Sequence, residues 1–176
     1  NARVGTSATD WELIESQQAG AGSGLPLARD LVINDGDTIK LGDTALKIYV
    51  TPGHSAGALT IEMQARAGNR RYRIFNSRVG IRIPPNMTAA YIKSIERIKQ
   101  LGPWDGYLPE HGFLSMRAPQ FTPRDFYLGA PPPPKPAGPN ASVQGAAAIN
   151  AFLDELLRVA NQKLATEQKQ SPQTGA

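Results

Sequence analysis

Two pairs of β-type runs constrain the fold of this chain more than any other feature of its 176 residues. The first pair lies within residues 31–51 and is interrupted by a Gly-Asp turn at 42–43. The second pair lies within residues 59–75 and is interrupted by a Gly-Asn turn at 68–69. β-type runs on either side of a short glycine-containing turn are typical of β-hairpins. The pattern therefore predicts two hairpins and an antiparallel sheet.

Segments with helical character surround these hairpins. Cap-type residues precede a short helix expected near residues 11–17, and apolar residues recur at helical spacing over 91–101 and 147–164. A short run at 106–109 is expected to form a further strand. Strands with interspersed helices predict an α/β layered fold. Both tryptophans are expected to make core or subdomain contacts, and not to lie in a substrate site.

Composition narrows the chemistry that is open to the chain. There is no cysteine, so any metal ion must be held by histidine, aspartate or glutamate. The formal net charge of +4 comes from dispersed arginines and lysines, and we therefore expect no nucleic-acid partner. No apolar run approaches the roughly 18 residues of a membrane span, and no membrane partner is expected.

The two histidines of the chain follow β-type runs and lie beside glycine. His54 is in the stretch YVTPGHSAGALT between the hairpins, and His111 is in PEHGF after the short strand. Loops at strand ends are where α/β folds build their sites. A single loop histidine is more often incidental, but two in equivalent positions favour a shared metal site. The hydroxyl of Ser55, next to His54, is expected to stabilise the turn locally.

The stretch TPGHSAG resembles the Thr-Pro-Gly-His-(Thr/Ser)-x-Gly motif of the metallo-β-lactamase fold superfamily. The order of elements after it is also similar: a hairpin, a polar turn, a helix, a short strand and a final histidine. The resemblance implies the C-terminal part of an αββα sandwich. We expect residues 1–168 to form this portion and residues 169–176 to form a disordered tail.

The resemblance also implies roles for four residues. His54 would complete a three-histidine site for a first zinc ion, and His111 would bind a second zinc ion. The similarity is greatest to the β-lactamase subclass that has an Asp-Ser pair after the second hairpin; Ser77 fits this pair, whereas Asn76 replaces the aspartate. Ser77 is a candidate catalytic residue that orients a zinc-bound water, or alternatively a hydroxyl that stabilises the turn. Asn76 is assigned to substrate binding.

The His-x-His-x-Asp-His motif of this superfamily is absent from the sequence. We therefore interpret the chain as a fragment, expect the missing N-terminal portion as its partner, and expect the segment alone to be inactive. The implied function is zinc-dependent hydrolysis, with a zinc-bound hydroxide that opens the cyclic amide of a small-molecule β-lactam and confers antibiotic resistance. Export to the periplasm or the medium is expected by the same analogy. The alternatives are a lactone, ester or thioester hydrolase of the same fold, or a degenerate, non-catalytic binding domain.

Overall fold

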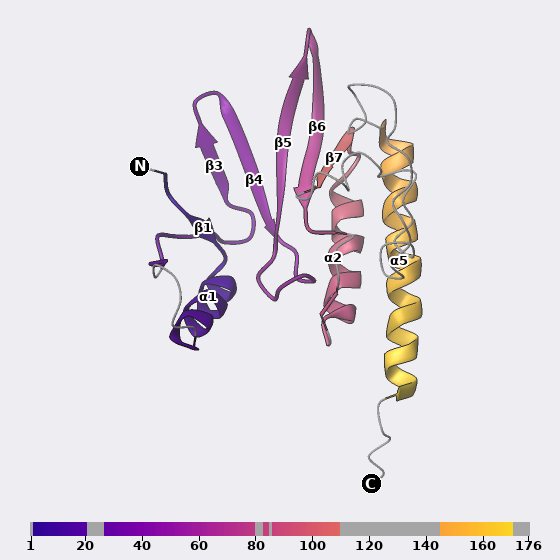
Figure 1. The fold of residues 1–176 in the computed structure, drawn as a ribbon. Coiled ribbons are helices and arrows are strands. Elements are labelled where there is room, and N and C mark those ends of the chain that lie inside the picture. The colour runs from indigo at the N-terminus through magenta and orange to yellow at the C-terminus, as the bar shows by residue number, and fades with distance from the viewer. Residues whose placement is uncertain (1, 21–26, 80–82, 85, 110–144, 171–176) are drawn as a thin grey trace, which may run out of the picture.

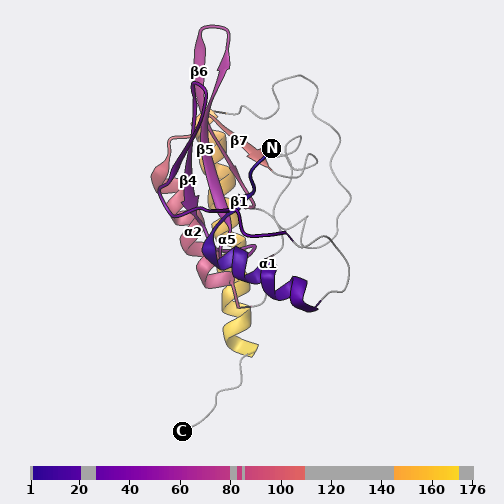
Figure 2. The same ribbon diagram turned by 90° about the vertical axis from the view of Figure 1, so that its left-hand side faces the viewer.

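The computed structural model describes residues 2–20, 27–79, 83–84, 86–109 and 145–170, which form a two-stranded sheet, a five-stranded sheet and three helices (Figure 1, Figure 2). None of the helices within these ranges is long and apolar enough to cross a membrane. In chain order the elements are β1 (Gly5–Thr6), α1 (Ala8–Gly20), β2 (Leu31–Val32), β3 (Thr38–Leu41), β4 (Thr44–Val50), β5 (Leu59–Ala67), β6 (Arg70–Ser77), α2 (Thr88–Leu101), β7 (Gly106–Pro109) and α5 (Gly145–Gln170).

The main sheet contains both predicted hairpins and has the strand order β3-β4-β5-β6-β7. Neighbouring strands are antiparallel except for β6 and β7, which are parallel. Gly42 and Gly68 both have φ of +57°, in the left-handed region that glycine adopts without strain, and they make the hairpin turns that the sequence predicts. β1 and β2 form a separate parallel pair. The predicted α/β fold class is confirmed.

The register of the main sheet decides which side chains share a face. Residues directly opposite one another on neighbouring strands lie on the same face, and successive residues along a strand lie on opposite faces. One row across the sheet is Lys47, Glu62, Phe75 and Tyr107. The next row, on the other face, is Ile48, Ile61, Asn76 and Leu108. Asn76 and Ser77 therefore lie on opposite faces.

Helices α2 and α5 cover the face that carries Phe75 and Tyr107. Figure 1 shows the two helices side by side next to β7. The ring of Phe75 lies 4.9 Å from that of Tyr107 and 5.0 Å from that of Trp104. The helices bury one apolar stripe each against these rings, as their amphipathic spacing predicts; the stripes are Tyr91, Ile92, Ile95 and Ile98 on α2, and Ile149, Leu153, Leu156 and Ala160 on α5.

Both helices are longer than the sequence pattern indicates. Helix α2 begins at Thr88 rather than Tyr91, and α5 runs from Gly145 to Gln170. The first two residues of the expected tail, Lys169 and Gln170, are thus helical, and the remaining six lie outside the described residues. The added residues, 88–90, 145–146 and 165–170, are small or polar and carry no apolar period, so periodicity alone places these ends too far inward.

Arg73 joins the sheet to the end of α2. Its guanidinium donates to both carboxylate oxygens of Glu62, at 2.7 and 2.9 Å, and to the carbonyl oxygen of Leu101 at 2.7 Å. It also lies over the Trp104 ring, 4.3 Å from the centroid. The hydrogen bonds from Arg73 lower the pKa of Glu62, against the effect of burial. Burial raises the pKa of Tyr49, whose hydroxyl donates to the same carboxylate, to about 12.

Helix α1 is fixed to the small β1–β2 layer by Trp11. This side chain is fully buried, and its indole N–H donates to the carbonyl oxygen of Leu31 at 2.8 Å. Trp104 is also buried, so the prediction that both tryptophans make core or subdomain contacts is confirmed. The helix begins at Ala8, earlier than expected, because the hydroxyl of Ser7 accepts from the backbone N–H of Asp10 and caps its first turn.

The helix layer generates the first testable prediction. Leu153 on α5 is fully buried among aromatic and aliphatic side chains, so Leu153→Ala removes packing that its neighbours refill only partly. We expect the free energy of unfolding to fall by about 2–5 kcal/mol in urea titrations. The matched control is Leu41→Ala at an exposed strand end, with an expected change within about 0.5 kcal/mol. Equal effects of the two substitutions would contradict the packing of α5 on the sheet.

Candidate functional site

The loop that carries His54 connects β4 to β5 and is closed at its base by the backbone. The N–H of Thr51 donates to the carbonyl oxygen of Ala58 at 2.7 Å, and the N–H of Gly53 donates to that of Ser55 at 3.0 Å. On the α2 side, the Ser94 hydroxyl donates to the carbonyl oxygen of Pro52 at 2.7 Å. The loop therefore packs against α2 immediately before the histidine.

A glycine is required where this loop meets α2. A Cβ atom added to Gly53 would lie 2.7 Å from Cδ2 of the buried Tyr91 ring, closer than real Cβ contacts come. The Pro-Gly sequence before His54 thus has a steric reason, because the chain must approach the helix closely there. The sequence suggested a turn at this position; the structure adds the side chain that the turn packs against.

Three buried hydroxyl groups lie beneath the loop. The Thr51 and Thr60 hydroxyls are 2.7 Å apart, and Thr60 donates to the Ser77 hydroxyl at 2.8 Å. All three residues are at most 5% exposed. The chain of hydroxyls joins β4, β5 and β6 at the end of the sheet from which the His54 loop leaves.

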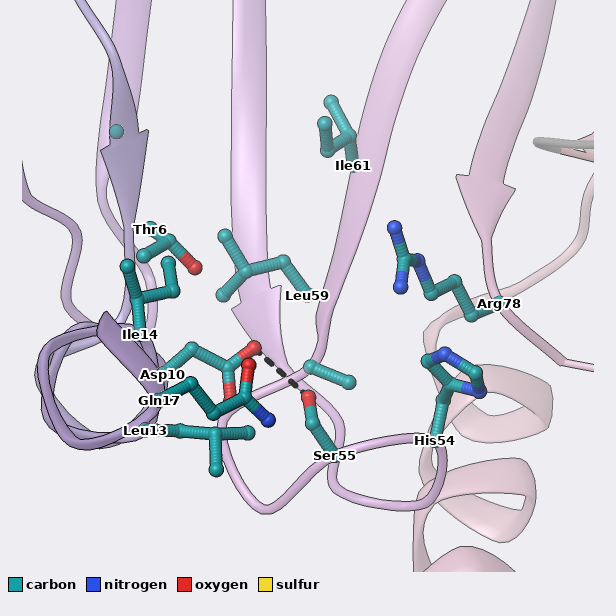
Figure 3. A pocket seen from close by; sticks show the side chains of 12 residues that line it. Thr6, Asp10, Leu13, Ile14, Gln17, His54, Ser55, Leu59, Ile61 and Arg78 are labelled. Carbon is teal, nitrogen blue, oxygen red and sulfur yellow. Dashed lines mark hydrogen bonds between the residues drawn. The ribbon is translucent and has the colours of Figure 1, made fainter. Parts of the chain in front are cut away.

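His54 lines a pocket of about 570 Å³ between α1 and the main sheet (Figure 3). Its imidazole is half-buried, and its Nδ1 atom is buried without a hydrogen-bond partner among the described residues. A buried polar atom without a partner costs about 1–3 kcal/mol, so it marks a position where a further group is expected. The pocket is lined by Thr6, Asp10, Leu13, Ile14 and Gln17 on one side, and by His54, Ser55, Leu59, Ile61 and Arg78 on the other.

Asp10 joins the two walls of the pocket. Its carboxylate accepts from the Ser55 hydroxyl at 2.7 Å and from the N–H of Gly57 at 3.0 Å, and Figure 3 shows the bond to Ser55. The expectation that Ser55 stabilises its turn locally is therefore wrong. Its partner is 45 residues away in the sequence, on α1. A hydroxyl that bonds to a distant element leaves no periodic signal in the sequence.

The predicted site residues do not all meet in this pocket. His54 lines it, whereas Ser77 and Asn76 do not. Ser77 is buried on the helix-covered face of the sheet, and the Asn76 amide donates to the carbonyl oxygen of Leu108 at 2.7 Å on the other face. His111 lies outside the described residues, so its expected approach to His54 stays a prediction. The catalytic role of Ser77 and the substrate-binding role of Asn76 also remain predictions.

Two pocket residues were not identified from the sequence. Asp10 has one signal, since it falls in the run of cap-type residues before α1. Arg78 directly follows Asn76 and Ser77, which the sequence pattern placed in a polar turn but which are the last two residues of strand β6. Figure 3 shows its side chain beside His54. A guanidinium and an imidazole at one end, with Leu59 and Ile61 beside them, give the pocket a polar end and an apolar wall.

The described residues alone do not fit a zinc site. Within ranges 2–20, 27–79, 83–84, 86–109 and 145–170, no group of three or more His, Cys, Asp or Glu side chains is placed to hold a metal ion. Zinc sites use three or four protein ligands. The carboxylate that lines the pocket, that of Asp10, already accepts hydrogen bonds from the loop through both oxygens. A metal at His54 therefore needs ligands from outside these residues.

Solved structures of metallo-β-lactamases are similar to this chain in fold. BJP-1, a subclass B3 enzyme of Bradyrhizobium japonicum, has a TM-score of 0.67 and 19% identity, over 96% of this chain and 65% of that one. LRA-12, a class B3 di-zinc enzyme from an Alaskan soil metagenome, has a TM-score of 0.65 and 20% identity, over 92% and 63%. A mutant of FEZ-1 from Legionella gormanii has a TM-score of 0.68 and 18% identity, over 99% and 66%.

These similarities establish the fold. The chain has the metallo-β-lactamase fold, and it spans less than two thirds of each of these three enzymes. No family model and no curated protein matches the sequence. At such low identity the shared architecture does not carry activity or substrate with it.

The buried hydroxyls generate the second prediction. Ser77→Ala removes the acceptor of the Thr60 hydroxyl in a place that water does not reach, so we expect the free energy of unfolding to fall by about 1–3 kcal/mol in urea titrations. The control Ser16→Ala removes an exposed hydroxyl on α1 and should change it by less than about 0.5 kcal/mol. An unchanged stability in Ser77→Ala would show that the hydroxyl chain carries little energy.

Proposed function

We propose that this chain is part of a zinc-dependent hydrolase, with His54 as one of the metal ligands. The observation that carries the proposal is the geometry of His54: an imidazole at a strand-end loop, lining a pocket, with a buried ring nitrogen that no described residue satisfies. Its place in a metallo-β-lactamase fold supports the same reading. His111 is proposed as a second ligand, and the remaining ligands as residues of the part of the fold that this chain does not span.

The proposed substrate is a small molecule with a cyclic amide, as in β-lactams. The names of the structural neighbours support this choice, because each is described as a metallo-β-lactamase. The pocket volume of about 570 Å³ falls within the range of small-molecule sites. A lactone, ester or thioester substrate is the alternative within the same chemistry. Export to the periplasm or medium remains a prediction.

The proposed partner is the portion of the fold that the chain lacks. The face of the sheet opposite α2 and α5 is mostly apolar: Ile48, Ile61 and Leu108 share a row with Asn76, and Met63 lies opposite Ile74. Leu108 is 39% exposed. The β1–β2 layer is small, because each of its two strands is only two residues long. Apolar sheet faces are stabilised when another layer covers them. We propose that the missing strands pack on this face and bring the other ligands to His54.

A non-catalytic binding domain is the second candidate function. Two observations favour it: the described residues hold one pocket imidazole and no cluster of three ligands, and the Asn76 amide is committed to a backbone carbonyl. Under this proposal the pocket would keep its volume and its His54–Arg78 end without any metal. The two candidates differ in zinc content, which makes them separable by experiment.

The third prediction concerns metal content and activity. We expect the 176-residue chain to bind zinc weakly and to lack hydrolase activity, because one or two imidazoles do not make a zinc site. The product of the complete open reading frame should retain zinc after dialysis and hydrolyse nitrocefin or a lactone. His54→Ala in that product should abolish zinc retention and turnover together, whereas the matched control Asn34→Ala, at an exposed position, should not.

Metal analysis by plasma mass spectrometry and a spectrophotometric assay make the measurement. Strong zinc binding and turnover by the 176-residue chain alone would contradict the proposal that ligands are missing from it. A complete product that holds no zinc, or that holds it unchanged in His54→Ala, would contradict the hydrolase proposal and favour the binding domain.

A further inference from the structure

The loop that carries His54 is held from two directions by different means. Before the histidine, Pro52 and Gly53 pack on α2 through the Ser94 hydroxyl and the Tyr91 ring. After the histidine, the side chain of Asp10 on α1 accepts two hydrogen bonds from the loop. These two bonds to Asp10 hold the segment between His54 and the start of β5.

The two bonds to Asp10 restrict the loop in a way that one bond would not. One donor is the Ser55 hydroxyl and the other is the backbone N–H of Gly57, so the carboxylate spans three consecutive loop residues. Bonds to a charged acceptor are stronger than neutral ones, and two acceptor oxygens fix direction as well as distance. His54 directly precedes Ser55, so it is next to the segment that Asp10 holds.

Steric contact adds to the restriction. A Cβ atom on Gly57 would lie 1.9 Å from the Ser7 hydroxyl oxygen and 2.8 Å from both the backbone nitrogen and a carboxylate oxygen of Asp10. The first turn of α1 therefore sits directly on the loop, and only glycine fits there. The loop cannot shift toward α1, and the two hydrogen bonds oppose a shift away from it.

The position of Asp10 in its helix makes it suited to this contact. It lies in the first turn of α1, where a carboxylate is stabilised by the helix dipole. The Ser7 hydroxyl caps the N–H of Asp10, so the carboxylate is not used as the cap and extends across the pocket to the loop. Figure 3 shows Asp10 and Ser55 pointing toward each other from opposite walls.

We infer that Asp10 is a positioning residue for His54: it holds the loop so that the imidazole faces the pocket. The inference rests on the proposed function for its consequence, which is tighter metal binding at His54. Its structural content, a fixed imidazole, does not depend on any metal. Residues that hold a ligand in direction commonly change metal affinity by about 10- to 100-fold when they are replaced.

The experiment compares Asp10→Asn with Ser55→Ala and with Asp30→Asn as a matched control. Asp30 also accepts two hydrogen bonds, from the side chain of Arg3 and the N–H of Val4, but it does not touch the His54 loop. In the 176-residue chain we expect Asp10→Asn to shift the His54 ring resonances and to speed hydrogen exchange at the Gly57 amide. Ser55→Ala should have a smaller effect on both, and Asp30→Asn none.

In the product of the complete open reading frame, the probe is Zn²⁺ alone, titrated against a competing chelator. Asp10→Asn should raise the dissociation constant about 10- to 100-fold, and Asp30→Asn should leave it unchanged. Unchanged His54 resonances in Asp10→Asn, or equal effects of Asp10→Asn and Asp30→Asn, would overturn the inference. A wild-type product that binds no zinc would refute the proposed function instead, while the resonances in the 176-residue chain still decide the role of Asp10.

Discussion

The buried hydroxyl chain of Thr51, Thr60 and Ser77 is the interaction on which the pocket end of this structure depends. It joins three neighbouring strands at the point where β4 ends, β5 begins and β6 ends. Each of these hydroxyls would be costly to bury alone, and the chain satisfies them in a row. The His54 loop leaves the sheet directly above it, so the geometry of the loop follows from the strand ends being fixed there.

On this base, two helices hold the loop by different physical means. Helix α2 is held by the apolar core, and it contacts the loop through close packing of Tyr91 against Gly53. Helix α1 belongs to the small β1–β2 layer and contacts the loop through the carboxylate of Asp10. The packing contact does not depend on charge, whereas the contact with Asp10 consists of two hydrogen bonds to a carboxylate. The loop that carries the imidazole is therefore held by close packing before His54 and by hydrogen bonds after it.

The sequence predicted those parts of the fold that have a local period. The glycine turns at Gly42 and Gly68 placed both hairpins, and the spacing of Ile95 and Ile98 placed α2. It also singled out His54, which the structure places in the wall of a pocket. The resemblance of that loop to a known motif agreed with the fold seen in the solved structures.

The parts that escaped prediction depend on contacts between distant segments. The bond from Ser55 to Asp10 joins residues 45 positions apart, and no sequence pattern near either residue indicates it. The sequence pattern indicated a polar turn at Asn76 and Ser77, whereas both residues belong to β6 and lie on opposite faces of the sheet. Which face the helices cover is settled only when α2 and α5 dock.

The central claim is that the His54 imidazole is a metal ligand and that ligands from outside the described residues complete its site. A crystal that contains this chain together with the proposed missing portion of the fold, grown with zinc and measured on both sides of the zinc absorption edge, tests it most directly. The account predicts an anomalous peak about 2.0–2.1 Å from a ring nitrogen of His54, with further ligands from residues that this structure does not describe. A zinc-loaded crystal in which His54 carries no peak, or in which the pocket binds an organic ligand without metal, would contradict it.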